Sequence, residues 1–305
     1  MSVTIALAGN PNCGKTTMFN ALTGANQYVG NWPGVTVEKK EGKLKNQKDV
    51  TVTDLPGIYS LSPYTLEEVV SRDYLLKEKP DVIIDLVDAT NIERNLYLAT
   101  QLLEIGIPVV IALNMVDLLK KNNIHINVKG LSSALGCPIV ETSALKGTGL
   151  KEVVDEAIKC ANQHRVPSKQ MEFPKAVEKA VNEIEGFVPA NIAEENKRWY
   201  AVKLLERDSK VKEGLNLPAS AQSRIEEIAS GLEKAEDDDT ESIVTDGRYQ
   251  YIQKVVSANV KRSGNKMTVS DKIDRIVTNR VLGLPIFILT MFIVYYVSVT
   301  TVGTW

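Results

Sequence analysis

Apolar and polar positions change their pattern at about residue 165. Before it, six short apolar runs of the kind found in strands alternate with helical segments near 15–24, 91–104 and 148–163. This alternation is typical of a mostly parallel sheet with helices on both faces. From about 168 to 262 the strand-like runs disappear and helical periodicity replaces them. The pattern therefore predicts an α/β domain over 1–165 and an all-helical domain over 166–265.

The predicted helices of the second domain are Ala176–Gly186, Ala193–Asp208, Ala219–Lys234 and Glu241–Arg262. The last part of the chain, Val281–Trp305, contains no charged residue. As a helix, 25 residues would cover roughly 37 Å, more than a hydrocarbon core of about 30 Å. The alternative, a buried core helix, is the weaker one because soluble helices normally keep a polar face.

Basic residues precede this apolar segment: Lys266, Lys272, Arg275 and Arg280. By the positive-inside rule they place the start of the segment on the cytoplasmic side. We therefore predict that 266–305 is a basic junction followed by the first transmembrane helix of a longer membrane protein. Residues 1–280 would then lie in the cytoplasm.

Composition and net charge indicate which classes of partner the chain can bind. Of the 305 residues 44% are apolar, and the net charge is −2 with a pI near 5.9. A protein that binds nucleic acid needs a basic face, so this balance argues against nucleic acid as a partner. The three cysteines form no C-x-x-C pair, which is typical of the reducing cytosol.

The most informative motif is G-x-x-x-x-G-K-[ST] at residues 9–16, between the apolar run Val3–Ala8 and the helical run Thr17–Leu22. Successive backbone N–H groups of such a loop converge on phosphates, aided by the positive end of the following helix. Lys15 can reach the β- and γ-phosphates, and the Thr16 hydroxyl can ligate Mg²⁺. For Cys13 we favour a small loop filler over a reactive thiolate. The predicted phosphate contacts are Gly9, Asn10, Pro11, Asn12, Cys13, Gly14, Lys15, Thr16 and Thr17.

A second motif indicates the base. Asn114, Met115, Val116 and Asp117 follow the apolar run Ile107–Leu113, and ligands of open α/β sheets bind at this carboxyl edge. An aspartate there can accept hydrogen bonds from N1–H and the exocyclic amine of guanine, a donor pattern that adenine lacks. The motif lacks the usual lysine at its second position, so alone it could be a plain Asn/Asp turn.

Further downstream, Ser143, Ala144 and Leu145 follow the short run Pro138–Val140 and resemble the last guanine-contact loop of small GTPases. The order and spacing of the motifs favour guanine.

Two candidate switches lie between these loops. Asp54, Leu55, Pro56 and Gly57 resemble the D-x-x-G switch of GTPases, in which Asp54 would hold Mg²⁺ and the Gly57 N–H would sense the γ-phosphate. Gly34, Val35 and Thr36 form the candidate first switch, with Thr36 closing over Mg²⁺. The alternative for Thr36 is a residue chosen only for its strand propensity. The predicted catalytic residues are Asn12, Lys15, Thr36 and Gly57.

Ras-type enzymes orient the attacking water with a glutamine just after D-x-x-G, and here that position is Ile58. Asn12 resembles the asparagine of potassium-activated GTPases, whose side-chain carbonyl helps to hold K⁺ where an arginine finger would act. The alternative is that Asn12 only satisfies the backbone of its own loop. Glu67 and Glu68, in the second switch, are candidates for a water network, but we favour solvated residues on a helix face.

The motifs together resemble the FeoB family of bacterial ferrous-iron transporters. The resemblance rests on G-N-P-N-x-G-K-T-T-x-F-N, V-G-N-W-P-G-V-T-V-E, D-L-P-G-I-Y-S-L-S-P-Y, the string at 88–98, N-M-V-D and the junction at 274–280. It implies a Ras-like P-loop GTPase domain, a helical domain similar to a GDP-dissociation inhibitor, and the start of a permease.

The resemblance further implies GTP and GDP as ligands, Mg²⁺ and activating K⁺ as cofactors, and slow hydrolysis that gates or drives Fe²⁺ uptake across the bacterial cytoplasmic (inner) membrane. It leaves open a homo-oligomer and small accessory Feo proteins as partners.

Two other functions are compatible with the sequence. A soluble potassium-dependent GTPase of ribosome or tRNA maturation shares the Asn12-type loop, but it would need a basic RNA-binding surface. The other is a regulatory domain in which the bound nucleotide, and not its hydrolysis, sets the gate; Ile58 keeps this alternative open.

Overall fold

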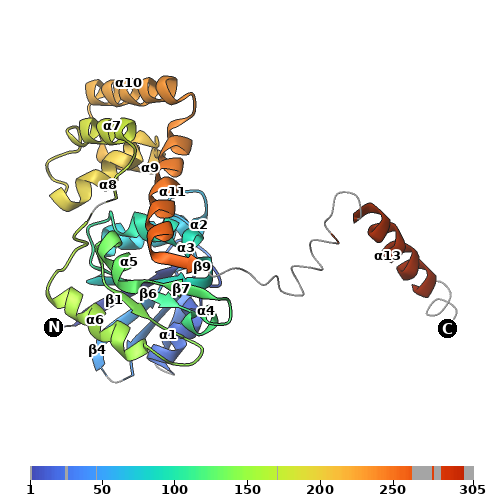
Figure 1. Cartoon of the computed structure of the whole chain (residues 1–305). Helices are drawn as coiled ribbons and strands as arrows, with labels where there is room; N and C mark the ends of the chain where they lie inside the picture. The colour runs from blue at the N-terminus through green and yellow to red at the C-terminus, as the bar shows by residue number, and fades with distance from the viewer. Residues whose placement is uncertain are drawn as a thin grey trace. The chain divides into compact units, whose positions relative to one another are not determined.

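The computed structural model describes residues 2–24, 27–45, 47–169, 171–262, 277 and 283–298. The chain divides into two compact units, Met1–Lys261 and Arg262–Trp305. The first unit begins with a seven-stranded sheet with helices on both faces and continues into helices α7 to α11 (Figure 1). The prediction of an α/β domain followed by a helical domain is therefore confirmed.

The strand order of the sheet is β2-β3-β4-β1-β5-β6-β8. β1 pairs in parallel with β4 and β5, and the parallel pairing continues through β6 to β8, whereas β2, β3 and β4 pair antiparallel. The strands are β1 Val3–Gly9, β2 Gln27–Asn31, β3 Glu38–Leu44, β4 Gln47–Asp54, β5 Val82–Asp88, β6 Val109–Asn114 and β8 Ile139–Glu141.

The prediction of six strands was wrong, because β2 and β3 form an antiparallel hairpin that a search for apolar runs misses. β3 reads Glu-Lys-Lys-Glu-Gly-Lys-Leu and is mostly polar. The segment Val35–Val37, which has the composition of a strand, lies instead in the loop of this hairpin. The Trp32 N–H donates to the Val37 carbonyl across that loop at 2.8 Å.

Side chains alternate between the two faces of the sheet, and each face has its own core. On β1, Ile5 and Leu7 join the core that contains Met18 and Phe19 of α1, whereas Ala6 and Ala8 join the opposite core. Both faces are covered, as a parallel arrangement requires. The helices of this domain are α1 Lys15–Thr23, α2 Leu66–Asp73, α3 Ile92–Leu102, α4 Val116–Leu119, α5 Val128–Leu135 and α6 Leu150–Asn162, with short turns at Tyr74–Glu78 and Ala89–Asn91.

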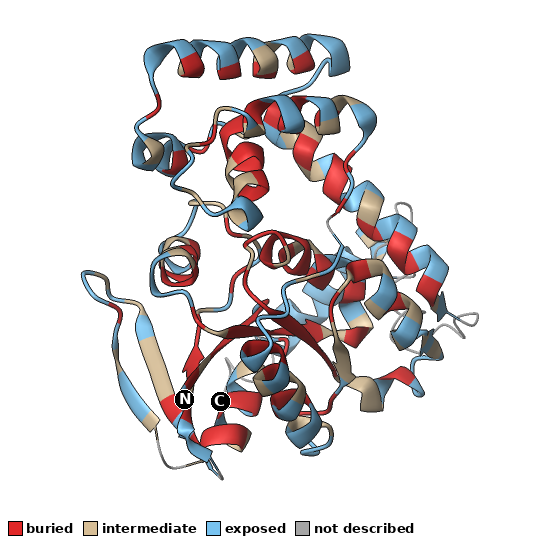
Figure 2. Ribbon diagram, turned by 90° about the vertical axis from the view of Figure 1, so that its left-hand side faces the viewer, coloured by how far each residue is buried: buried red, intermediate tan, exposed pale blue. Residues whose placement is uncertain are grey.

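The helical domain consists of α7 Lys175–Glu185, α8 Glu194–Leu205, α9 Ser209–Leu215, α10 Ala219–Glu236 and α11 Thr240–Asn259. Helix α10, the uppermost in Figure 2, turns its buried residues towards the other helices and its exposed residues away. Helix α11 runs back to α3 and α5 of the first domain (Figure 1). Trp199 and Val244 of the helical domain belong to the same continuous core as Ala6 of the sheet.

Two predicted helices end earlier than expected. The predicted helix Ala193–Asp208 stops at Leu205, because Arg207 adopts a left-handed φ of 57° and Asp208 caps the next helix, accepting from the Val211 N–H at 3.0 Å. The predicted helix Glu241–Arg262 stops at Asn259, and β9 (Val260–Arg262) pairs with β7 (Ile124–Ile126). Strand structure is therefore not absent from 168–262.

The described part of the second unit contains α13 (Gly283–Val297), a helix of 15 residues. Within the described residues, no helix combines the length and apolarity needed to cross a membrane. The predicted span Val281–Trp305 extends beyond the described residues at both ends, and the four basic residues before it also lie outside them. The predicted membrane segment therefore stays a prediction.

The carboxyl group of Asp85 lies inside the core. Asp85, on β5 between Ala8 of β1 and Ile111 of β6, is 1% exposed. Its Oδ2 atom has no hydrogen-bond partner among the described residues. Burial disfavours the charged form and raises the pKa of Asp85 from 3.8 to about 7.

We expect Asp85→Asn to remove the part of the pH dependence of folding stability that comes from ionisation of Asp85. Between pH 3.8 and about 7 the unfolded chain ionises Asp85 while the folded chain keeps it protonated. Stability should therefore fall as pH rises through this window, by up to about 1.4 kcal/mol per pH unit. The amide does not ionise, so the Asn variant should gain stability over the original chain as pH rises. Urea unfolding at several pH values measures this.

The matched control is Asp49→Asn, which changes an exposed aspartate on β4. Its stability curve should run parallel to that of the original chain. A parallel curve for Asp85→Asn would contradict the prediction.

Candidate nucleotide-binding site

The phosphate-loop motif forms a tight connection between β1 and α1. β1 ends at Gly9, α1 begins at Lys15, and the backbone adopts positive φ at Asn12 (67°) and Gly14 (96°). A Cβ atom on Gly14 would come within 2.4 Å of the Asn114 side-chain nitrogen, so no other residue fits. Helix α1 has no side-chain cap, which leaves the N–H groups of its first turn available to an anion.

A cavity of about 680 Å³ lies at this helix end, within the size range of small-molecule sites. It is lined by residues from the phosphate loop, the D-x-x-G motif, the N-x-x-D motif and the Ser-Ala loop. The lining residues are Asn10, Pro11, Asn12, Gly14, Lys15, Thr16, Thr17, Gly57, Asn114, Met115, Asp117, Leu118, Ser143, Ala144 and Leu145. The structure therefore brings together four motifs that are up to 134 positions apart, from residue 10 to residue 144.

Other predicted contacts lie outside this lining. Gly9, Cys13, Asp54, Leu55, Pro56 and Val116 belong to the same loops without lining the cavity, whereas Gly34, Val35 and Thr36 lie in the β2–β3 hairpin loop. Thr36 is exposed, and its predicted role stays a prediction. Leu118 lines the cavity and was missed. Its only signal in the sequence is its position directly after Asp117.

Lys15, of the phosphate-loop motif, and Asp54 form an ion pair. The Lys15 ammonium lies 2.5 Å from Asp54 Oδ1, and both side chains are at most 10% exposed. Burial raises the pKa of Asp54 above its usual range, and the Lys15 charge opposes this rise. β1 and β4 pair in register up to Leu7 and Asp54, which places the Asp54 carboxylate beside the start of the phosphate loop.

Asn114 joins the loops that surround the cavity. It is 2% exposed; its Nδ2 donates to the Cys13 carbonyl at 2.8 Å, and its Oδ1 accepts from the Ala144 N–H at 2.9 Å. The residue predicted to contact the base therefore holds the phosphate loop and the Ser-Ala loop together. Met115 adopts a left-handed φ of 63°, which turns the chain into α4.

Asp117, the predicted acceptor for the base, lines the cavity. The neighbouring Ser143 side chain and the Lys146 ammonium, 3.2 Å away, lower the pKa of Asp117. The carboxylate therefore stays ionised at neutral pH and can accept two hydrogen bonds from one ligand edge.

Ile58 and Glu68 are among the residues of the second switch (Leu55 to about Tyr74) whose side chains are buried. Ile58 is 2% exposed in the core, and its N–H donates to the Gly9 carbonyl at 3.3 Å, so its side chain does not face the cavity. The interpretation of Glu68 as a solvated residue was wrong, because Glu68 is 7% exposed. It forms a capping box with Thr65 at the start of α2 and accepts from the Ser60 hydroxyl.

The Cys13 side chain packs inside the phosphate loop and is not a reactive thiol. It is 1% exposed, and burial followed by the nearby Asp85 charge raises its pKa to about 12. A thiol with this pKa carries almost no thiolate at neutral pH.

Comparison with known proteins identifies the family of this chain. The family model of ferrous iron transport protein B matches residues 3–157, and the model of the FeoB cytosolic helical domain matches residues 173–261. The chain belongs to the FeoB family. The Fe(2+) transporter FeoB of Escherichia coli (strain K12) is 39% identical over 99% of this chain. An Fe(2+) transport protein A/Fe(2+) transporter FeoB fusion protein of Porphyromonas gingivalis is 40% identical over 96% of it.

These FeoB relatives are longer: the chain covers 39% of the Escherichia coli protein and 36% of the Porphyromonas gingivalis protein. Solved FeoB structures match most of this chain. A GDP-bound variant of the S. thermophilus FeoB G-domain has a TM-score of 0.82 at 47% identity, over 85% of this chain and 100% of that one. NFeoB from S. thermophilus bound to GDP.AlF4- and K+ has a TM-score of 0.77 at 48% identity, over 84% and 99%.

We expect no thiol of the native chain to react with Ellman's reagent at pH 8. All three cysteines are buried, and burial raises the pKa of each thiol. Unfolding in guanidinium chloride should release the thiols of Cys13, Cys137 and Cys160. Absorbance at 412 nm counts them; one fast-reacting thiol in the native chain, lost in Cys13→Ser, would contradict the buried filler role.

Proposed function

We propose that this chain binds guanine nucleotides and hydrolyses GTP to GDP and phosphate. The observation that carries the proposal is the meeting of two features in one cavity: a helix start whose N–H groups have no side-chain cap, and an ionised acceptor at Asp117. The solved FeoB relatives bound to GDP support it.

The residues of the cavity have distinct roles in this proposal. The backbone of 9–16 and the Lys15 ammonium bind the phosphates, and Asp117 accepts from the guanine edge. Gly57 lies in the lining, where its N–H can donate to the γ-phosphate. Because Ile58 offers no polar group, placement of the attacking water depends on backbone groups and on bound cations.

The oxygen donors present suit a magnesium ion. The Thr16 hydroxyl and the Asp54 carboxylate are the hard ligands that Mg²⁺ prefers, and they are the residues that would hold it. When bound, Mg²⁺ would neutralise charge on the phosphates. Asn12, exposed in the lining, would contribute its side-chain carbonyl to K⁺, a cation that would supply the charge of an arginine finger.

For the whole protein, we propose that this GTPase gates or drives Fe²⁺ uptake across the cytoplasmic membrane. The Fe(2+) transporters among the relatives support this, as does the apolar segment after residue 280. The fusion protein of Porphyromonas gingivalis supports a small accessory Feo protein as a partner. The buried Ile58 side chain favours a second candidate, in which the bound nucleotide sets the gate and turnover is incidental.

We expect hydrolysis to be at least tenfold faster in K⁺ than in Na⁺ at equal ionic strength, and Asn12 to carry this difference. A tenfold change in rate corresponds to about 1.4 kcal/mol of barrier, which one well-placed charge can supply. Asn12→Ala and Asn12→Gly should both lose the ion preference and keep GDP affinity. Phosphate release under multiple turnover measures the rate.

The Gly variant controls for backbone strain, because glycine adopts the φ of 67° at this position without cost and alanine does not. Equal rates in both salts would remove K⁺ from the proposal and favour nucleotide occupancy as the regulatory signal.

Guanine recognition has its own test. Asp117→Asn should weaken GDP binding roughly 10- to 100-fold, the size of a lost hydrogen bond to a charged group, and shift preference towards xanthine nucleotides. Asp155→Asn, on the exposed face of α6, is the control that should leave affinity unchanged. Competition with a fluorescent nucleotide measures both. Equal affinity of the original chain for ADP and GDP would refute the guanine assignment.

A further inference from the structure

One face of α3 and the turn after it contacts both the second switch and the helical domain. Arg94, Tyr97, Gln101 and Glu104 follow one another at spacings of three, four and three residues, which places them along a single stripe. Gln101 and Arg94 contact the second switch, whereas Tyr97 and Glu104 contact α11. The stripe therefore lies between the nucleotide loops and the helical domain.

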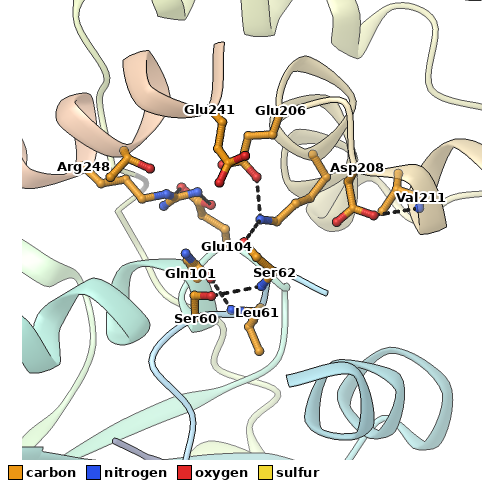
Figure 3. A network of polar contacts seen from close by, with 12 residues as sticks. Ser60, Leu61, Ser62, Gln101, Glu104, Glu206, Asp208, Val211, Glu241 and Arg248 are labelled. Atoms are coloured by element: carbon orange, nitrogen blue, oxygen red, sulfur yellow. Dashed lines mark hydrogen bonds and ion pairs between the residues drawn. The ribbon is translucent and has the colours of Figure 1, made fainter. Parts of the chain in front are cut away.

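The contacts of this stripe with α11 are rigid. The Arg248 guanidinium donates to both oxygens of Glu104 at 3.0 and 2.7 Å, and both side chains are 1% exposed (Figure 3). The ring of Tyr97 stacks on Tyr249 with centroids 5.1 Å apart, and its hydroxyl lies 3.2 Å from Thr245 Oγ1. A bidentate ion pair favours one geometry, so these contacts fix how α11 packs against α3.

The second switch is fixed to α3 and the helical domain from Leu61 onwards. The Gln101 side-chain oxygen accepts from the Leu61 N–H at 2.6 Å, with both residues buried (Figure 3). Further along, the Lys203 ammonium lies 3.4 Å from Ser62 Oγ. At the end of α2, the Arg72 guanidinium donates to Asp208 at 2.6 Å, again with both side chains buried. The short segment 57–60 is held differently: the Ile58 N–H donates to the Gly9 carbonyl at 3.3 Å and the Ser60 hydroxyl to Glu68 at 3.2 Å, both outside the helical domain.

Arg94 is the residue of the stripe that contacts this segment. Its guanidinium lies 4.4 Å from the centre of the Tyr59 ring, a cation–π distance. Its backbone carbonyl accepts from the side chain of Asn10, in the phosphate loop, at 3.5 Å. Arg94 therefore contacts both the phosphate loop and the residue that follows Ile58.

We propose that Arg94 is a positioning residue for GTP hydrolysis, which acts by holding Tyr59 and with it the backbone of 57–60. The inference rests on the proposed GTPase function. Ile58 has no polar side chain, so the backbone of this segment, together with the bound cations, meets the water and the γ-phosphate. The contact between Arg94 and Tyr59 sets how often that backbone is in place, whereas nucleotide affinity is set by the phosphate loop and Asp117.

The test measures kcat, KM and GDP affinity of the full chain in K⁺. Arg94→Ala should lower kcat about two- to fivefold, the size of an exposed cation–π contact, and leave KM and GDP affinity unchanged. Tyr59→Ala should lower kcat by the same factor, and Tyr59→Phe should not, because the ring and not the hydroxyl carries the contact. Arg94→Lys should lie between Arg94→Ala and the original chain.

A double-mutant cycle decides whether the two residues act together. Arg94→Ala combined with Tyr59→Ala should lose no more activity than either single variant. Arg224→Ala, a surface arginine on α10, is the control for a changed charge, and thermal unfolding checks that each variant is folded.

Each other outcome overturns the inference. Multiplying losses in the double variant, or a loss in Arg94→Ala without a loss in Tyr59→Ala, would mean that Arg94 acts by another route, such as direct contact with the phosphates. A parallel fall in GDP affinity or thermal stability would mean a merely structural role. If the original chain hydrolyses GTP and Arg94→Ala does so equally fast, the positioning role fails while the GTPase function stands. Absence of hydrolysis by the original chain would instead refute the proposed function.

Discussion

The parallel pairing of the strands around β1 is the constraint on which the nucleotide site depends. β1, β4, β5, β6 and β8 all run in one direction, so the residues that follow them emerge at one edge of the sheet. Gly9 and Asn114 end two of these strands, and the D-x-x-G motif begins as β4 ends. Reversing any one strand would move its motif to the opposite edge. The shared direction of the strands therefore determines which motifs meet at the site.

Buried polar groups hold the loops at this edge together and connect the sheet domain to the helical domain. The Asn114 side chain joins two loops of the cavity, and two buried ion pairs, Arg72–Asp208 and Glu104–Arg248, join the sheet domain to the helical domain. Such pairs add little net stability, but removing one partner leaves an uncompensated charge, so the two domains favour one arrangement. Contacts through α3 thus connect the second switch to α11.

Much of the site could be predicted because its residues carry local signals. The phosphate loop is recognisable since glycine, lysine and threonine are required at fixed spacing between a strand and a helix. The β2–β3 hairpin was missed because its strands are polar and half-exposed, and strand pairing, not apolar periodicity, stabilises them. Glu68 was misinterpreted for a related reason: a glutamate on a helix is usually solvated, and only its capping box with Thr65 explains its burial.

The sequence by itself determined the order of the domains, the motifs of the nucleotide site and the absence of a polar side chain at Ile58, because each depends on residue type and local spacing. The tertiary structure alone decided which partners distant residues have. Asn114, predicted as a nucleotide contact, also joins two loops, and the pairing of Arg94 with Tyr59 has no counterpart in local spacing. Contacts between residues far apart in sequence depend on how the sheet and helices pack, and no periodicity within one segment encodes that packing.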